Sequence, residues 1–222
     1  VDFFKEHRTG ILMTRTATPA TMGLSALPKA NFGEAEGKGV DISLNYTHSF
    51  SSGLWLQAMG NFTYAASKYL KFEEPYYDEA PWKRHVGYSL GQQWGYIAER
   101  LFVDDEEARR SPKQFGEYGG GDIKYYDVNG DGQITSLDQV PIGYPVRPEI
   151  TYGFGFSVGY KSFDFSAFFQ GLGRESFWIN TKATAPFVSY LYDNETLNGK
   201  PQNQLLKAYA DSHWSEDNQN TY

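Results

Sequence analysis

The chain contains no cysteine among its 222 residues. Disulfide bonds, thiolate metal sites and a cysteine nucleophile are therefore excluded. The formal net charge is −7, with 20 Lys and Arg against 27 Asp and Glu, and the basic residues form no cluster along the sequence. This balance argues against a nucleic-acid-binding surface, so we expect no nucleic-acid partner.

Long apolar runs are also missing. No stretch of about 18 apolar residues occurs, which excludes a membrane-spanning helix. A transmembrane β-strand is only half apolar, so this test does not detect it. The first residues carry no signal-peptide pattern, and the chain begins and stops in mid-pattern. We therefore expect it to be a piece of a longer polypeptide.

Signatures of catalysis are absent as well. The sequence contains neither H-E-x-x-H nor G-x-S-x-G, and its four histidines are scattered. The glycine run Gly119–Gly121 lacks the lysine that would follow in a phosphate-binding loop, so it is predicted to be a flexible turn. These absences predict no catalytic residues, and the chain is not expected to be an enzyme.

Aromatic residues and glycine are abundant. Aromatics make up 17 % of the chain, with 17 Tyr and 16 Phe, alongside 23 Gly. This mixture is typical of a β-protein with many turns. Four segments alternate apolar with small or polar residues, each about as long as the 9–11 residues that a tilted strand needs to cross a bilayer. They are Gly39–Ser49, Leu54–Tyr64, Thr151–Tyr160 and Phe163–Gly171. A fifth, patchier strand is expected over Val1–Thr16.

The alternation assigns a face to each side chain. One face is apolar and aromatic, and we expect it to contact lipid; it includes Phe154, Phe156, Phe165 and Phe169. The other is small and polar, and we expect it to line an interior; it includes Asn45, Asn61, Asp164 and Gln170. Phe168 interrupts the polar side of the pattern.

The connections differ strongly in length. Phe50–Gly53 and Lys161–Ser162 are short, whereas Ala17–Lys38, residues 67–149 and residues 173–222 are long. Tyr88–Ile97 also looks extended, but a single extra crossing would break the up–down order, so we expect a hairpin inside the long loop. Short turns on one side and long loops on the other are typical of an outer-membrane barrel. A soluble sandwich would keep most connections near about 4–6 residues.

The segment Asp127–Asp138 has the spacing of a calcium-binding loop. It reads Asp-Val-Asn-Gly-Asp-Gly-Gln-Ile-Thr-Ser-Leu-Asp, with oxygen ligands at four of the required positions, a backbone carbonyl donor and a turn glycine. The pattern predicts a structural Ca²⁺ held by Asp127, Asn129, Asp131, Gln133 and Asp138. The last position is Asp rather than Glu, which shortens its reach and lowers the expected affinity. The alternative is an Asx-rich turn without metal.

Several segments, taken together and in order, resemble the C-terminal part of SusC/RagA-type TonB-dependent outer-membrane transporters of Bacteroidetes. They are Gly121–Gly132, Pro141–Pro145, Pro148–Gly155 and Phe163–Gly171. The resemblance implies an all-β fold, a fragment of a large antiparallel transmembrane β-barrel of about 22 strands, with long extracellular loops and short periplasmic turns. It also implies import of glycans or peptides with a SusD-like surface lipoprotein, driven by TonB, in the outer membrane of a Gram-negative bacterium.

On this resemblance, residues 1–222 form part of the barrel domain. Residues 67–149 would be an extracellular loop region that contains the calcium-type loop, and residues 173–222 a second loop with a short helix over Gln202–His213. The plug domain and the segment that binds TonB would lie outside the chain.

The loops hold further candidates. Trp82, Trp94, Trp178 and Trp214 could stack on sugar rings or contact the lipoprotein; the alternative is local loop packing. The acidic pair Glu73–Glu74 and the run Asp104–Glu107 are expected to be solvated, the run at the start of a helix; the alternative for the run is an acidic patch that binds a second cation.

Two rival functions remain open. A dockerin-like binding module would use the same calcium spacing, but dockerins carry two repeats, each followed by a helix. Here there is one repeat, followed by Pro141, Pro145 and Pro148. The other rival is a secreted β-sandwich protein that acts on or binds glycans.

Overall fold

A computed structural model describes residues 1–16, 18–75, 77–78, 80–179, 185–186 and 204–219. The chain divides into two compact units. The first comprises Val1–Trp94 and Pro141–Ser176, and the second comprises Gly95–Val140 and Phe177–Tyr222. No helix among the described residues is long and apolar enough to cross a membrane.

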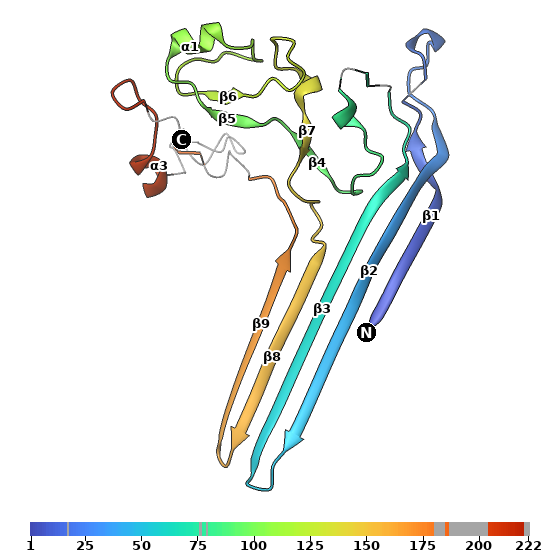
Figure 1. Ribbon diagram of the computed structural model, residues 1–222, viewed down its shortest axis with the longest axis vertical. Coiled ribbons are helices and arrows are strands. Elements are labelled where there is room, and N and C mark those ends of the chain that lie inside the picture. Colours follow the sequence, from blue (N-terminus) through green and yellow to red (C-terminus); the bar gives the residue numbers. More distant parts are fainter. Residues whose placement is uncertain (17, 76, 79, 180–184, 187–203, 220–222) are drawn as a thin grey trace, which may run out of the picture. The chain divides into compact units, whose positions relative to one another are not determined.

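The first unit is built on one antiparallel five-stranded sheet in the order β1-β2-β3-β8-β9 (Figure 1). Its strands are β1 (Asp2–Thr14), β2 (Lys29–Ser49), β3 (Leu54–Lys71), β8 (Ile150–Tyr160) and β9 (Phe163–Gly173). The expected all-β fold and the five expected strands are confirmed. Within the described residues the sheet is open, because β1 and β9 each pair with one neighbour.

The register brings the predicted faces of the strands together. Leu54 lies opposite Tyr160, and Phe62 lies between Ile42 on one side and Tyr152 on the other. Directly opposed residues of antiparallel strands point to the same face. The apolar residues of the four alternating segments therefore form one continuous face, on which Phe154 stacks on Phe169 with 5.2 Å between ring centroids.

Few side chains of this sheet are buried. Among the described residues of the first unit, the buried apolar residues are Ala35 and Ala80, whereas many large apolar residues of the sheet are exposed. Soluble monomers rarely expose so large a contiguous apolar surface. The sheet is therefore exposed to its surroundings on both faces and does not cover a packed core.

The two tight turns lie at the same end of the sheet (Figure 1). In the turn after β2, the amide of Phe50 donates to the carbonyl of Leu54 at 2.8 Å, and Gly53 has a φ of +80°. In the turn after β8, Lys161 adopts a φ of +55°. Both turns join neighbouring strands of the sheet, as predicted.

Two strands are longer than the sequence pattern predicted. β2 begins at Lys29, so the second half of the expected loop Ala17–Lys38 is strand, and β3 continues beyond Tyr64 to Lys71. The alternation was hidden because this part of β2 carries charged side chains. The two carboxylates among them are paired across the strands: the Lys5 ammonium lies 2.8 Å from the Glu36 carboxylate, and the Lys71 ammonium lies 3.7 Å from the Glu34 carboxylate.

The segment Tyr88–Ile97 lies outside the large sheet, as expected, but it is not a hairpin. Its short strand β4 (Gln93–Gly95) pairs with β7 (Val140–Ile142), which is distant in sequence. The segment is also anchored to the extended end of β3, where the Tyr69 amide donates to the Tyr88 carbonyl at 2.9 Å. The prediction failed because the partner strand lies more than forty residues away.

Phe168 breaks the alternation for a structural reason. It lies opposite Gly155 on the polar face, and a Cβ atom added at Gly155 would come within 2.8 Å of its ring. The aromatic ring therefore occupies space that the glycine leaves free. Trp55 lies over Gly159 in the same way.

The second unit has a small core of its own. Strands β5 (Ala98–Leu101) and β6 (Ile123–Tyr125) pair antiparallel, and helices α1 (Asp105–Arg110), η3 (Ser136–Asp138) and α3 (Lys207–Asp211) lie in the same unit. Its buried side chains are Phe102, Ala108, Gln114, Ile134 and Asp138. The helix predicted over Gln202–His213 is confirmed only as the five residues of α3, and residues 202 and 203 lie outside the described part.

The first unit also contains two short 3-10 helices among its described residues, η1 (Ala20–Met22) and η2 (Pro81–Lys83).

Candidate functional site

The polar face of the sheet gathers the residues predicted to line an interior. Asn61 lies opposite Gly153, which in turn lies opposite Gln170 on the next strand. Asp164 lies opposite Gly159 on the same face, and Asn45 lies opposite Met59. The register thus brings all four predicted residues to one side. Their amides and carboxylate are suited to hydrogen bonding with water or with a polar ligand.

A groove lies on this polar face near the end opposite the tight turns. Its volume is about 700 Å³, in the range of small-ligand sites. Much of its lining is apolar, from Phe4, Tyr69, Leu90, Pro145, Val146 and Pro148. The sequence pattern missed the groove because these residues come from four separate segments of the chain.

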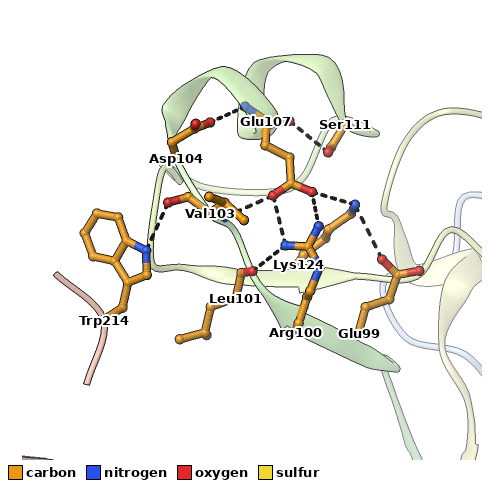
Figure 2. Close-up of polar contacts among 9 residues, drawn as sticks. All are labelled: Glu99, Arg100, Leu101, Val103, Asp104, Glu107, Ser111, Lys124 and Trp214. Carbon is orange, nitrogen blue, oxygen red and sulfur yellow. Dashed lines mark hydrogen bonds and ion pairs between the residues drawn. The ribbon is translucent and has the colours of Figure 1, made fainter. Parts of the chain in front are cut away.

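A different kind of site is organised by Glu107 in the second unit (Figure 2). The Arg100 guanidinium donates to its carboxylate, at 2.9 Å from Nη1 to Oε2, and the Lys124 ammonium lies 3.0 Å from Oε1. The amide of Val103 also donates to Oε2, at 3.0 Å. One carboxylate therefore ties β5, β6 and α1 together.

The acidic run Asp104–Glu107 begins helix α1, as predicted. The Asp104 carboxylate accepts a hydrogen bond from the Glu107 amide at 2.7 Å and so caps the helix N-terminus. The expectation that the whole run is solvated is wrong for Glu107. Hydrogen bonds from Arg100 and then from the Val103 amide lower the pKa of Glu107 from 4.5 to about 2, with Lys124 contributing in the same direction.

The glycine run Gly119–Gly121 forms a turn, as predicted, and it contacts both helix α1 and Trp214. The Gly120 amide donates to the Asp105 carboxylate at 2.8 Å, and Gly121 has a φ of +86°. The ring of Trp214 lies against the run, so that a Cβ atom at Gly121 would come within 2.6 Å of it. The indole nitrogen of Trp214 donates to the Val103 carbonyl at 3.1 Å (Figure 2).

The four candidate tryptophans do not form one platform. Trp94 stacks on His85 at 4.5 Å between ring centroids, and its indole nitrogen lies 3.5 Å from the Trp82 carbonyl oxygen, all within the first unit. Trp178 is 63 % exposed, whereas Trp214 is half-buried in its contact with the glycine run. The packing of Trp94 and Trp214 supports the local-packing alternative, and a role in ligand contact stays a prediction.

The acidic pair Glu73–Glu74 was expected to be solvated, and this is wrong. Glu73 is buried and forms an ion pair with Arg15. The Glu74 carboxylate accepts a hydrogen bond from the His85 amide at 2.7 Å. These contacts join the ends of β1 and β3 to the loop that follows, a non-local arrangement that the sequence pattern does not reveal.

The calcium-type loop is closed by its own hydrogen bonds. The Asp127 carboxylate accepts from the amides of Gly130 and Gly132 at 2.7 and 2.8 Å. Asp138 is fully buried, and its carboxylate accepts from the amides of Val128 at 2.9 Å and Thr135 at 2.7 Å. Asp138 therefore joins the two ends of the loop.

The fit of this loop to calcium is partial. The Asn129 side-chain oxygen accepts from the Asp131 amide at 3.1 Å, and the Asp131 carboxylate accepts from the Gln133 amide at 2.8 Å. These oxygens keep further lone pairs for a hard cation. However, within the described part of the chain no three His, Cys, Asp or Glu side chains are grouped so that they could hold a metal.

The residues that follow the loop also bear on the dockerin alternative. After η3 the chain continues as strand β7, and no α-helix follows the loop directly. A dockerin repeat requires such a helix, so the structure gives that reading no support.

No family model matches the chain. The chain is similar to TonB-dependent receptor P3 of Formosa agariphila, with 27 % identity over 151 residues that cover 63 % of this chain and 15 % of the receptor. It is also similar to TonB-dependent receptor P26 of the same organism, with 47 % identity over 51 residues that cover 23 % of this chain and 5 % of the receptor.

The fold is similar to solved structures of the RagAB peptide transporter. One of them matches with a TM-score of 0.58 and 20 % identity, over 98 % of this chain and 22 % of the matched chain. The 'open-open' state of the RagAB peptide importer matches with a TM-score of 0.52 and 19 % identity, over 78 % of this chain and 18 % of that chain. These matches confirm the resemblance drawn from the residues, and the chain spans only a small part of each protein it matches.

Proposed function

We propose, from this similarity to TonB-dependent receptors, that the chain forms part of the barrel wall and extracellular loops of a SusC/RagA-type outer-membrane importer. The observation that carries the proposal is the continuous apolar face across strands in register, with both tight turns at one end. Along β3 this face runs from Leu54 to Tyr64. At about 3.4 Å per residue and a tilt of about 45°, that length spans about 25 Å of bilayer.

In this role the two faces of the sheet contact different surroundings. The apolar face contacts acyl chains, and the backbone amides are satisfied by the ladder between strands, as a lipid environment requires. The polar face lines the interior with amides and hydroxyls. The free edges of β1 and β9 pair with further strands of the barrel.

The proposed partners follow from the same reading. The importer takes up oligosaccharides or peptides together with a SusD-like lipoprotein, and TonB drives it through another part of the protein. Residues 72–149 and the residues after 173 form extracellular loops. A role in binding or transport, rather than catalysis, is supported by matched proteins that are receptors and importers.

The face assignment is tested by labelling two neighbouring positions. The chain contains no cysteine, so Phe165→Cys and Asp164→Cys each introduce a single thiol into it. In the full-length protein, freed of cysteines elsewhere and reconstituted in vesicles, a bimane at position 165 should be quenched by brominated acyl chains. A bimane at position 164 should instead be quenched by iodide in the water-filled interior. The reverse result would overturn the assignment.

Uptake tests the transport proposal itself. A strain that lacks the full-length protein should lose uptake of a labelled oligosaccharide or peptide, and the native protein should restore it only while the inner membrane is energised. Restored uptake after dissipation of the proton gradient would contradict TonB-driven import.

We also propose that the Asp127–Asp138 loop binds Ca²⁺ weakly in a structural role. Asp131→Asn tests this, because the amide still offers an oxygen to the Gln133 amide but removes a charged ligand. Terbium luminescence displaced by Ca²⁺ should give an affinity of about 10⁻⁴–10⁻³ M for the native loop and a clearly weaker one for the variant. Equal affinities would favour the metal-free Asx-rich turn.

A further inference from the structure

Charged side chains of β1, β2 and β3 lie directly beyond the apolar part of the sheet, on the same face as the apolar side chains. On β2, Lys38 follows the alternation of Val40 and lies opposite Lys5 of β1. On the other flank, Glu36 lies opposite Lys68 of β3. The first irregularity in the β2–β3 register comes only beyond Ala35, so these side chains share the face of the apolar band.

The cluster of Lys5, Lys38, Lys68 and Glu36 has more positive than negative charge. The Glu36 carboxylate lies 2.8 Å from the Lys5 ammonium and 3.6 Å from that of Lys68. Among the described residues, no carboxylate lies within ion-pair distance of Lys38. Like charges directly opposite each other in a sheet are destabilising, which applies to Lys5 and Lys38. Three lysines therefore surround one glutamate, and the arrangement favours binding of an anion.

Arg174, which directly follows β9, adds a cation on the same side. The Arg174 guanidinium lies 5.7 Å from the ring centre of Tyr64, the last aromatic residue of the apolar face on β3. It also donates to the Glu149 carboxylate at 2.6 Å. Since Tyr64 belongs to the apolar face, Arg174 lies at the rim of that face.

A cavity lies among these cations. The pairing of β8 with β3 ends at Tyr64, and β3 continues beyond that point. The resulting cavity has a volume of about 360 Å³, and its lining includes Lys38, Lys68 and Arg174, together with Glu36 and Glu149, which pair with Lys68 and Arg174. It adjoins the surface that contacts acyl chains in the proposed function.

We propose that this cavity, the rim cavity, binds the phosphate of an anionic lipid headgroup. The inference rests on the proposed function, because the cavity lies at the level of the lipid headgroups only if the adjoining apolar face contacts the acyl chains. A lipid is the favoured ligand because its acyl chains extend along the apolar face while its phosphate meets Lys38 and Lys68. Basic side chains beside a bilayer attract anionic lipids in this way.

The test compares lipid binding by the full-length protein and its variants in detergent. Native mass spectrometry counts bound dioctanoyl phosphatidic acid, with dioctanoyl phosphatidylcholine as the zwitterionic probe. The double variant Lys38→Gln/Lys68→Gln should bind phosphatidic acid about 25-fold more weakly, since each cation near an anionic lipid surface contributes a factor of about five. Lys161→Gln, which removes one lysine at the opposite end of the sheet, should change binding less than about twofold.

Lys38→Gln alone keeps every ion pair of the cluster and should weaken binding about fivefold, even if the double variant fails to fold. Unchanged binding in Lys38→Gln would overturn the proposal. Inorganic phosphate that displaces the lipid at equal concentration would also overturn it, in favour of a free-anion site. Insertion into phosphatidylcholine vesicles is measured separately: it should be equal for the native protein and Lys38→Gln, and its failure in the native protein would instead count against the proposed function.

Discussion

At the scale of single residues, Glu107 shows how a local motif can hide a non-local role. Asp104–Glu107 was predicted from sequence to lie at the start of a helix, where acidic residues are favourable. The contacts of Glu107 with Arg100 and Lys124 come from two strands. No spacing rule predicts that these strands meet, so the sequence predicted the start of the helix and missed both the capping hydrogen bond and the ion-pair cluster.

Replacing Glu107 by Gln should destabilise the second unit by about 1–3 kcal/mol, because charged hydrogen bonds are lost while Arg100 and Lys124 remain. Amide hydrogen exchange of β5 and β6 would report the change. Glu106→Gln is the matched control: Glu106 is largely exposed, and among the described residues it pairs only with Arg110, so its effect should stay below about 0.5 kcal/mol. Equal effects of the two variants would contradict the role assigned to Glu107.

The lowered pKa of Glu107 also predicts a dependence of stability on pH. A carboxylate whose pKa falls from 4.5 to about 2 on folding stabilises the native state at pH values above 4.5. That contribution should be lost as the pH falls from 4.5 towards 2. Exchange protection of β5 in the native protein should therefore decline over this window more than in Glu107→Gln. Parallel profiles for the two proteins would exclude Glu107 as the cause.

At the scale of elements, alternation predicted the faces of the strands well and their ends poorly. Leu54–Tyr64 was recognised because apolar and polar residues alternate, but its continuation to Lys71 was not, since Ala65–Ser67 are all small and Lys68 places a charge on the otherwise apolar face. In the proposed barrel wall, the physical cause is a change of surroundings along one strand: the backbone ladder continues beyond the part of the strand that contacts lipid.

The face assignment predicts unequal effects for neighbouring positions of β9. Phe169 lies near the middle of the apolar face, because it pairs with Phe154, which pairs with Gly60. Phe169→Arg should therefore cost about 2–4 kcal/mol in a refolding titration of the full-length protein in lipid, because the charge enters the acyl-chain region. Gln170→Arg, on the opposite face, should cost less than about 1 kcal/mol, because the interior is hydrated. A larger penalty at position 170 than at position 169 would show that the faces are reversed.

At the scale of the whole molecule, the order of the strands was predictable because tight turns require neighbouring strands, and the loops were not. The second unit depends on contacts such as that of Trp214 with Val103, which are 111 residues apart. The rim cavity likewise combines Lys38, Lys68 and Arg174 from three strands or their ends, so no basic run marks it in the sequence.

The open sheet leads to a last prediction, for the 222-residue chain produced alone. Its edge strands β1 and β9 leave rows of unpaired backbone groups, and its apolar face has no partner in water. In aqueous buffer the chain should therefore aggregate, and lipid should not rescue a monomer, because each unpaired amide in a bilayer costs several kcal/mol. The full-length protein in detergent should instead be monodisperse and heat-modifiable on gels. A soluble, folded monomer of 25.2 kDa would contradict the barrel-wall proposal and favour a soluble β-domain.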